Sequence, residues 1–283
     1  MSTSRTAAPG PAPELRFHRS LRPVAMLREL WARRELVAVL TERDLRARYK
    51  QTKVGFGWAL LTPFLLMVVF TLVFDRVADV PTNGIPYPVF SYIGLLPWVF
   101  FSGSLSKGAI SITSNLSLLN KVYCPREVFP LSTVAVSAVD TAIATSILAI
   151  LFVVYGVVPT PEAVWVPVLV AVLVAFTCGV TLLLSACVVY LRDIRQVLPM
   201  LLQFGLFATP IGYSLEEIPR AWWPAYAAAN PLGPVIDGLR RCVLLGEPPR
   251  LGLLAIAAVS SALWLSVAYL LFKRMETGFA DVA

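Results

Sequence analysis

The sequence is short of charge. Charged residues make up 14% of its 283 residues and hydrophobic residues 57%, with a mean hydropathy of +0.73. A soluble globular chain normally carries charge on about a quarter of its residues. These values exclude an ordinary soluble domain and indicate an integral membrane protein.

Histidine is almost absent, and cysteine is sparse. The single histidine is His18, and the four cysteines are Cys124, Cys178, Cys187 and Cys242. No two of these cysteines have the spacing of a metal site or a redox motif. We therefore expect neither a metal centre nor histidine-based catalysis, and we interpret the cysteines as isolated thiols.

The sequence also lacks a complete catalytic or nucleotide-binding motif. Gly103 and Gly108 have the separation found in a phosphate-binding loop, but Ala109 and Ile110 stand where Lys and Ser or Thr are needed. There is no Ser-His-Asp set, and the adjacent acids at 216 and 217 would diverge on a helix. We expect a protein that is not an enzyme and that binds no cofactor itself.

Long apolar blocks dominate what is present. A bilayer core is crossed by about 20 apolar residues in a helix. Six blocks reach or approach this length, and they lie near 54–74, 87–106, 131–155, 164–191, 197–213 and 251–272. The expected fold class is an all-α integral membrane protein with six transmembrane helices.

The segment before the last block, 214–250, is more mixed. Trp222 and Trp223 suit a membrane interface, whereas Pro231 and Pro234 interrupt any continuous helix. We predict that this external segment forms re-entrant or surface-lying short helices. A seventh complete span is the alternative.

The loop charges predict the orientation of the chain. Lys and Arg are retained on the cytoplasmic side of short loops. With six spans, 18 of them fall on the side of the two termini and 5 on the other, and Lys107 lies at the end of the second block. Both termini are therefore expected in the cytoplasm. The net charge of +7 follows from this topology, so no nucleic-acid partner is expected.

The N-terminal region has two parts. Residues 1–25 are rich in Pro and Ala and are predicted to be a disordered cytoplasmic leader; residues 276–283 form a cytoplasmic tail. In 26–53, apolar residues recur at helical spacing among arginines. This pattern predicts an amphipathic interface helix in contact with membrane lipids, and a basic segment that only directs topology is the alternative.

Four segments resemble a known family. They are RDLRARYKQTKVGFGWALLTPFLLMVVFTLVF (43–74), SNLSLLNKVYCPREVFPL (114–131), YLRDIRQVLPMLLQFGLFATPIGYSLEEIP (190–219) and NPLGPVIDGLRRCVLLG (230–246). Together they are similar to the membrane-spanning permease subunit of ABC exporters that move lipid-linked polysaccharides, such as O-antigen, teichoic acid and galactan. The resemblance extends from about residue 28 to about residue 275.

This resemblance implies a complete assembly and a function. The assembly would be a homodimer of six-span permeases with two copies of a separate nucleotide-binding subunit, which would bind ATP and Mg. The implied function is ATP-driven export of a polyprenyl-diphosphate-linked polysaccharide across the bacterial cytoplasmic membrane, for cell envelope biogenesis. A drug or lipid exporter of the ABC class is the alternative, and an ion-gradient-driven transporter is a more distant one, because such a transporter usually has several buried acids.

The loop 111–130 is a candidate for coupling to the ATPase. Asn115 is a plausible cap for a short helix that begins after it, and Pro125 and Pro130 would end that helix. The resemblance implies that this is the coupling helix; a plain intracellular loop is the alternative. The candidate contact residues are Asn115, Leu118, Asn120, Lys121, Tyr123, Arg126 and Glu127.

The substrate pathway is expected to present aromatic surfaces, because a glycan offers hydroxyl groups and apolar ring faces. The candidates are Tyr92, Trp98, Phe100, Phe101, Phe204, Phe207, Tyr213 and the intramembrane acid Asp140. Packing or interface anchoring is the alternative for each aromatic residue. A charge at mid-bilayer costs at least about 2.5–3.5 kcal/mol, so Asp140 either faces the protein interior or lies near the cytoplasmic surface.

A lipid diphosphate would need cations near the cytoplasmic leaflet. Arg46, Arg48, Lys50 and Lys53 lie where the interface helix meets the first span. Arg and Lys are the natural partners of phosphate oxygens. We interpret these four residues as candidate contacts for the lipid diphosphate.

Overall fold

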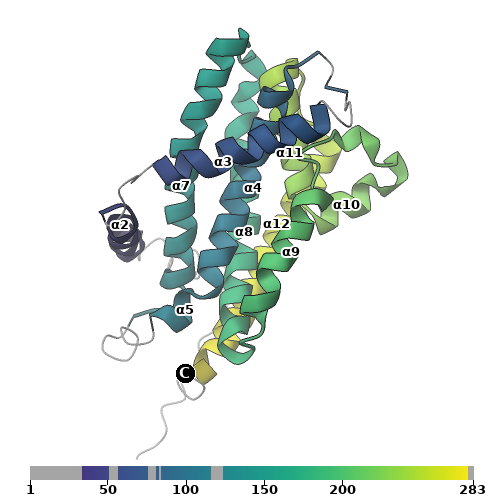
Figure 1. Ribbon diagram of the computed structural model, residues 1–283. Coiled ribbons are helices and arrows are strands. Elements are labelled where there is room, and N and C mark those ends of the chain that lie inside the picture. Colours follow the sequence, from purple (N-terminus) through teal and green to yellow (C-terminus); the bar gives the residue numbers. More distant parts are fainter. Residues whose placement is uncertain (1–33, 51–56, 76–80, 83, 116–123, 280–283) are drawn as a thin grey trace, which may run out of the picture.

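The computed structural model describes residues 34–50, 57–75, 81–82, 84–115 and 124–279, and in these ranges the chain is helical with no strand. Figure 1 shows a bundle of long helices, with one helix, α2, set to its side. The bundle follows from the sequence, because a helix that satisfies its own backbone hydrogen bonds is the natural way to place an apolar block in lipid.

Within the described residues, five helical segments are long and apolar enough to cross a membrane. They are α3 (Gly57–Phe70) with the π-turn Thr71–Asp75, α4 (Tyr87–Ala109), α7 (Val128–Tyr155), α8 (Val166–Tyr190) with the 3-10 turn Pro161–Trp165 before it, and α12 (Leu251–Met275). Of the six predicted blocks, 197–213 corresponds to the shorter α9 (Ile194–Ala208), which has 15 residues.

Helix α4 is the centre of the bundle. It packs against α7 on one side and α8 on another, and α8 packs in turn against α12. Most residues of α4 are buried, whereas α3 crosses α7 and α4 obliquely and exposes much of its surface (Figure 1). Gly179 of α8 allows the close approach to α12, because a Cβ there would lie 2.8 Å from the backbone nitrogen of Leu265.

The segment 214–250 contains two short helices, α10 (Trp223–Ala229) and α11 (Leu232–Arg240), which is followed by the π-turn Arg241–Leu245. Pro231 lies between the two helices, as expected from its missing N–H group. Both are far shorter than the bilayer core is thick, so the structure does not contain the alternative seventh span in this segment.

Helix α2 (Arg34–Lys50) is the described part of the predicted interface helix. It packs along α7, and its buried Leu40 meets Val128 and Phe129 at the start of that helix. The predicted leader, 1–25, lies outside the described residues. Only Leu40 and Thr41 of α2 are buried, so most of its surface remains open.

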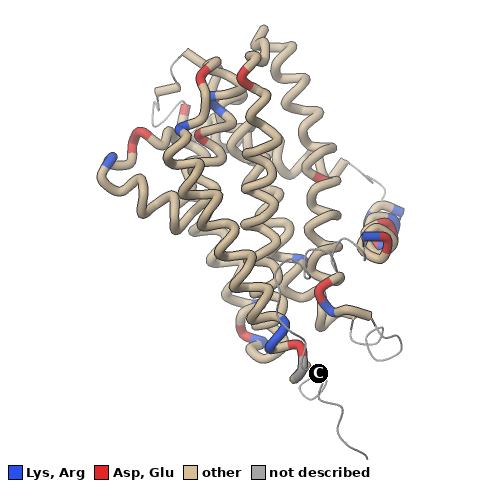
Figure 2. The backbone as a smooth tube through the Cα atoms, turned by 180° about the vertical axis from the view of Figure 1, so that it is seen from behind, with Lys and Arg blue, Asp and Glu red and all other residues tan. Residues whose placement is uncertain are grey.

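Charged residues gather on α2 and at the two ends of the bundle, and the middle of the bundle is mostly free of charge (Figure 2). One end unites three segments that are distant in sequence. Arg126, before α7, donates to the carbonyl oxygen of Glu276, and Tyr190 at the end of α8 donates to that of Met275 at 2.7 Å. The start of α7, the end of α8 and the end of α12 therefore lie together.

Candidate functional site

The clearest polar site lies where α2, α3, α4 and α7 meet. A pocket of about 240 Å³ is lined by residues from all four helices, and Asp140 of α7 lies in its wall. The neighbours of Asp140 on α7 are small, and Ser137 and Thr141 line the same pocket. Small side chains at these positions leave room for groups from the other helices to reach the carboxylate.

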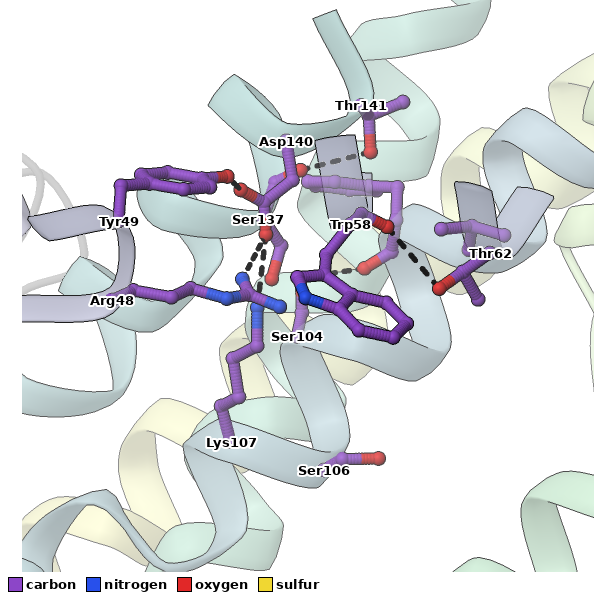
Figure 3. Close-up of polar contacts among 12 residues, drawn as sticks. Arg48, Tyr49, Trp58, Thr62, Ser104, Ser106, Lys107, Ser137, Asp140 and Thr141 are labelled. Atoms are coloured by element: carbon purple, nitrogen blue, oxygen red, sulfur yellow. Dashed lines mark hydrogen bonds and ion pairs between the residues drawn. The ribbon is translucent and has the colours of Figure 1, made fainter. Parts of the chain in front are cut away.

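Three side chains bind the carboxylate of Asp140 (Figure 3). Arg48 and Tyr49 reach it from α2, and Nζ of Lys107 reaches Oδ2 from α4 at 3.0 Å. Asp140 is 9% exposed, and a buried carboxylate is tolerated only when it is paired and hydrogen-bonded. The cluster therefore joins the interface helix to two helices of the bundle.

Tyr49 acts in this cluster as a hydrogen-bond donor. Burial, the hydrogen bond to Asp140 and the negative charge of Asp140 together raise the pKa of the Tyr49 hydroxyl to about 12, although the nearby Arg48 acts in the opposite direction. The phenol therefore keeps its proton at any physiological pH, and it continues to donate to Oδ1 of Asp140.

The three described residues among the predicted diphosphate contacts lie apart from one another in their pairing. Arg48 turns toward Asp140, whereas Arg46 lies exposed and pairs with Glu42 on the same helix. Lys50 is exposed at the end of α2. Lys53 lies outside the described residues. The structure instead adds Lys107, which sequence reasoning had left at the end of its span, to the side chains around Arg48.

The candidate pathway aromatics fall into two groups. Four of them, Tyr92, Trp98, Phe100 and Phe101, are buried in the core of α4. The Tyr92 hydroxyl donates to the carbonyl oxygen of Ala144 at 2.8 Å, and the Phe101 ring stacks on Phe176. These contacts are packing interactions between helices.

The other group lies on and after α9. Phe204 and Phe207 are 63% and 57% exposed. Gln203 is exposed beside them, so this face of α9 is both aromatic and polar. Tyr213 is half-buried, and its hydroxyl donates to the carbonyl oxygens of Phe207 and Ala208 at the end of the helix.

The coupling candidates are only partly described. Leu118, Asn120, Lys121 and Tyr123 lie outside the described residues. Asn115 follows the short helix α5 (Ser111–Ser114), where its Nδ2 donates to the carbonyl oxygen of Ser111 at 2.8 Å and its Oδ1 accepts from Arg43 of α2 at 3.1 Å. Asn115 therefore ends α5, and the helix that the sequence predicts after it lies outside the described residues.

The other end of this loop is held by the last helix. Glu127 is 1% exposed and pairs with Lys273 of α12 at 2.8 Å, and Lys273 also pairs with Glu276 at 3.0 Å. The Arg126 guanidinium lies over the ring of Phe279. The side chain of Glu127 is thus turned into the protein.

Sequence reasoning missed Arg240, which it had counted as an external loop charge. Arg240 is 5% exposed, and its guanidinium donates to four backbone carbonyl oxygens, those of Phe90, Pro210, Ile211 and Tyr213. It also lies 3.6 Å from the centroid of the Phe90 ring. The signal in the sequence was Pro210, just after the end of α9, because a chain that leaves its helix has backbone carbonyl groups without helical partners.

Comparison with known proteins agrees with this architecture. Residues 35–244 match the family model described as ABC-2 type transporter. The O-antigen export system permease protein RfbA of Myxococcus xanthus is 34% identical over 91% of this chain and 99% of that protein. The protein of the same name from Klebsiella pneumoniae is 28% identical over 88% of this chain and 95% of that protein.

The polysialic acid transport protein KpsM of Escherichia coli is more distant, at 27% identity over 74% of this chain and 81% of that protein. The family model covers all of the helices that form the Asp140 pocket. Five helices able to cross a membrane, and similarity over nearly the whole length of known permeases, lead to one assignment. This chain is a multi-pass membrane protein of the ABC-2 type transporter family.

Proposed function

We propose that this protein is the permease subunit of an ATP-driven exporter that moves a polyprenyl-diphosphate-linked polysaccharide across the cytoplasmic membrane. The observation that carries the proposal is the similarity to an O-antigen export permease over 91% of this chain and 99% of that protein. A match over most of this chain and nearly all of the other supports a shared membrane domain and not one shared segment. The proposal includes the expectation that both termini lie in the cytoplasm.

The exposed face of α9 supports a path for a glycan. A face that contacts only lipid would be apolar, yet Gln203 lies there beside Phe204 and Phe207. In a homodimer, two such faces would enclose a channel in which aromatic rings contact sugar rings and amides bind hydroxyl groups. The short α10 and α11 lie at its external end, next to the broken end of α9.

The energy would come from a separate nucleotide-binding subunit, present in two copies, which binds ATP and Mg. The chain has no complete phosphate-binding loop of its own. The loop that begins after Asn115 and ends at Arg126 would contact this subunit at the cytoplasmic face. Because Glu127 and Lys273 tie the end of the loop to α12, a movement of the loop would reach the membrane domain.

The test is to purify the chain with its partner ATPase and to measure ATP turnover in lipid, with and without polyprenyl-diphosphate-linked glycan. We expect a complex of two permeases and two ATPases whose turnover rises when the glycan is added. A complex that ignores the glycan but responds to a small drug or to phospholipid would favour the other class of ABC exporter. Failure of any ATPase to bind would overturn the proposal.

A gradient-driven transporter fits the structure less well. The three buried acids of the described chain, Glu127, Asp140 and Asp237, each pair with a Lys or Arg residue. An ion pathway needs acids that can exchange their ion or proton. Transport that continues without ATP and stops when the ion gradient is collapsed would reverse this conclusion.

A further inference from the structure

The Asp140 pocket has more positive charge than its own acid can balance. Arg48 and Lys107 both pair with the same oxygen atom, Oδ2 of Asp140, while Tyr49 donates to Oδ1. One carboxylate thus serves two cations, and the cluster keeps a net positive charge. The side chain of Lys107 is 33% exposed and lines the pocket, so its ammonium group is accessible to an anion.

A second observation points to a ligand in the same pocket. Ser137 is one of the residues that line the pocket and is 2% exposed, and its buried hydroxyl has no hydrogen-bond partner among the described residues. A buried polar group without a partner costs free energy, so native proteins rarely leave one. Ser137 lies one turn before Asp140 on α7, so its hydroxyl would suit an acceptor that is held by Lys107.

The remaining walls suit the groups next to a phosphate. Trp58 from α3 and Trp98 from α4 line the pocket, and Trp58 is half exposed. Their indole rings offer apolar surface to an isoprenoid chain or a sugar ring. A volume of about 240 Å³ is smaller than a typical ligand pocket, which fits a headgroup and not a whole lipid-linked glycan.

We propose that this pocket binds the diphosphate of an isoprenoid-linked substrate, and that Asp140 occupies the anion's place when the pocket is empty. The inference rests on the proposed function for the chemistry of its substrate. A diphosphate has more negative charge and more acceptor oxygens than a carboxylate, so it takes Lys107 and Arg48 from Asp140. Ser137 donates to one of its oxygens.

This exchange of partners loosens α2. Arg48 links the end of α2 to Asp140, and when Arg48 turns to the diphosphate, α2 loses this ion pair and, among the described residues, keeps the hydrogen bond from Tyr49 to that carboxylate. Earlier on the same helix, Arg43 donates to Oδ1 of Asn115 at 3.1 Å, directly before the coupling loop. Occupancy of the pocket is thus transmitted through α2 to the loop that meets the ATPase.

The binding test uses the permease in lipid nanodiscs and a polyprenyl diphosphate that carries no glycan. The affinity is measured for wild type and for Lys107→Gln, Asp140→Asn and Arg192→Gln. We expect Lys107→Gln to weaken binding by about tenfold, since a hydrogen bond to a charged group is lost. Asp140→Asn should tighten binding, because the competing carboxylate is gone. Arg192→Gln removes the same charge from the exposed α8–α9 junction and should change nothing.

Two further variants guard against misfolding. Lys107→Arg keeps the cation and should bind nearly as wild type does, and the pair Lys107→Gln with Asp140→Asn removes both charges and should bind weakly. Wild-type affinity in both Lys107→Gln and the double variant overturns the site. Equal binding of inorganic diphosphate identifies a soluble anion as the ligand, and equal binding of phosphatidylglycerol identifies a bulk lipid; either result overturns the substrate assignment.

Two outcomes separate this inference from the proposed function. In the first, bare polyprenyl diphosphate binds through Lys107, but ATP turnover of the complete complex does not respond to a linked glycan. This result supports the pocket assignment and overturns the proposed export of polysaccharide. In the second, the complex exports glycan, and the Lys107→Gln variant binds polyprenyl diphosphate and exports glycan as wild type does. This result supports the proposed function and overturns the pocket assignment. In the complex, Asp140→Asn should raise ATP turnover without substrate, because α2 is already released.

Discussion

At the scale of single residues, Arg240 shows how a buried charge can be held by backbone carbonyl oxygens. Its guanidinium donates to three carbonyl oxygens of the segment that follows α9 and to one of α4, and so it joins α11 to that segment and to α4. The planar guanidinium of Arg has several N–H donors that point in different directions and can reach several acceptors at once. The compact ammonium group of Lys cannot reach all of them. Gly94 is required beside it, because a Cβ there would lie 2.8 Å from Nη2 of Arg240.

Replacement of this arginine is therefore expected to be costly. We expect Arg240→Lys to lower the free energy of unfolding by at least about 2 kcal/mol, since buried carbonyl groups lose their donors. The measurement is thermal unfolding of the purified permease in detergent. Arg241→Lys is the matched control, because Arg241 pairs with the exposed Glu247 and a lysine can keep that ion pair. Equal melting temperatures for the two variants would contradict the prediction.

The Tyr49 hydrogen bond gives a prediction with a defined pH range. Because the pKa of the Tyr49 hydroxyl is raised to about 12 from its usual value of 10.0, the contact stabilises α2 fully below pH 10 and is lost as the pH rises toward 12. Tyr49→Phe should speed amide hydrogen exchange in α2 by the same factor at pH 7 and pH 9, after correction for the intrinsic rate. If the increase in exchange is smaller at pH 9 than at pH 7, the phenol loses its proton at a lower pH than expected.

At the scale of helices, the apolar blocks of the sequence predicted where most helices lie, but not how they meet. Hydrophobic runs locate α4, α7, α8 and α12, because each helix that crosses the bilayer core needs its own continuous apolar segment. The pairing of Asp140 with Arg48, which is 92 residues earlier in the chain, depends on how α2 lies along α7, and no local pattern encodes that. Asp140 itself was recognised because an intramembrane charge is rare.

The contact between α8 and α12 makes a further prediction at this scale. We expect Gly179→Ala to lower the melting temperature, since the new methyl group would lie 2.8 Å from backbone atoms of α12 that are not free to move aside. Gly252→Ala is the control. Outside its own stretch of α12, no atom lies within 4 Å of a Cβ built at Gly252, so that change should not lower the melting temperature. A Gly179→Ala protein as stable as the control would show that the two helices separate easily.

At the scale of the whole molecule, two kinds of exposed apolar surface can be distinguished. The surface of α12 around Val259 is apolar and suits lipid, whereas the surface of α9 combines Phe204 and Phe207 with Gln203. Sequence reasoning placed aromatic residues of both α4 and α9 on the pathway. It could not separate buried from exposed aromatics, because their apolar character is the same.

This distinction predicts a difference in transport. Phe204→Ala combined with Phe207→Ala should lower the export of polysaccharide several-fold while the permease still assembles with its ATPase, because sugar rings lose their apolar contacts. Surface glycan on intact cells is the measurement, with Val259→Ala as the control. Normal export by the double variant would mean that this face of α9 meets lipid.

The contacts that hold the end of α12 against the start of α7 also affect how the protein can be tagged or truncated. Glu276 supplies both a carboxylate to Lys273 and a carbonyl oxygen to Arg126, and the Phe279 ring lies under that arginine. Deleting the residues after Met275, or fusing a bulky reporter directly to them, would free the end of the 111–130 loop. An affinity tag is therefore better placed at the N-terminus. A variant truncated after Met275 would test the coupling: if the loop end is freed, ATP turnover should continue while transport decreases.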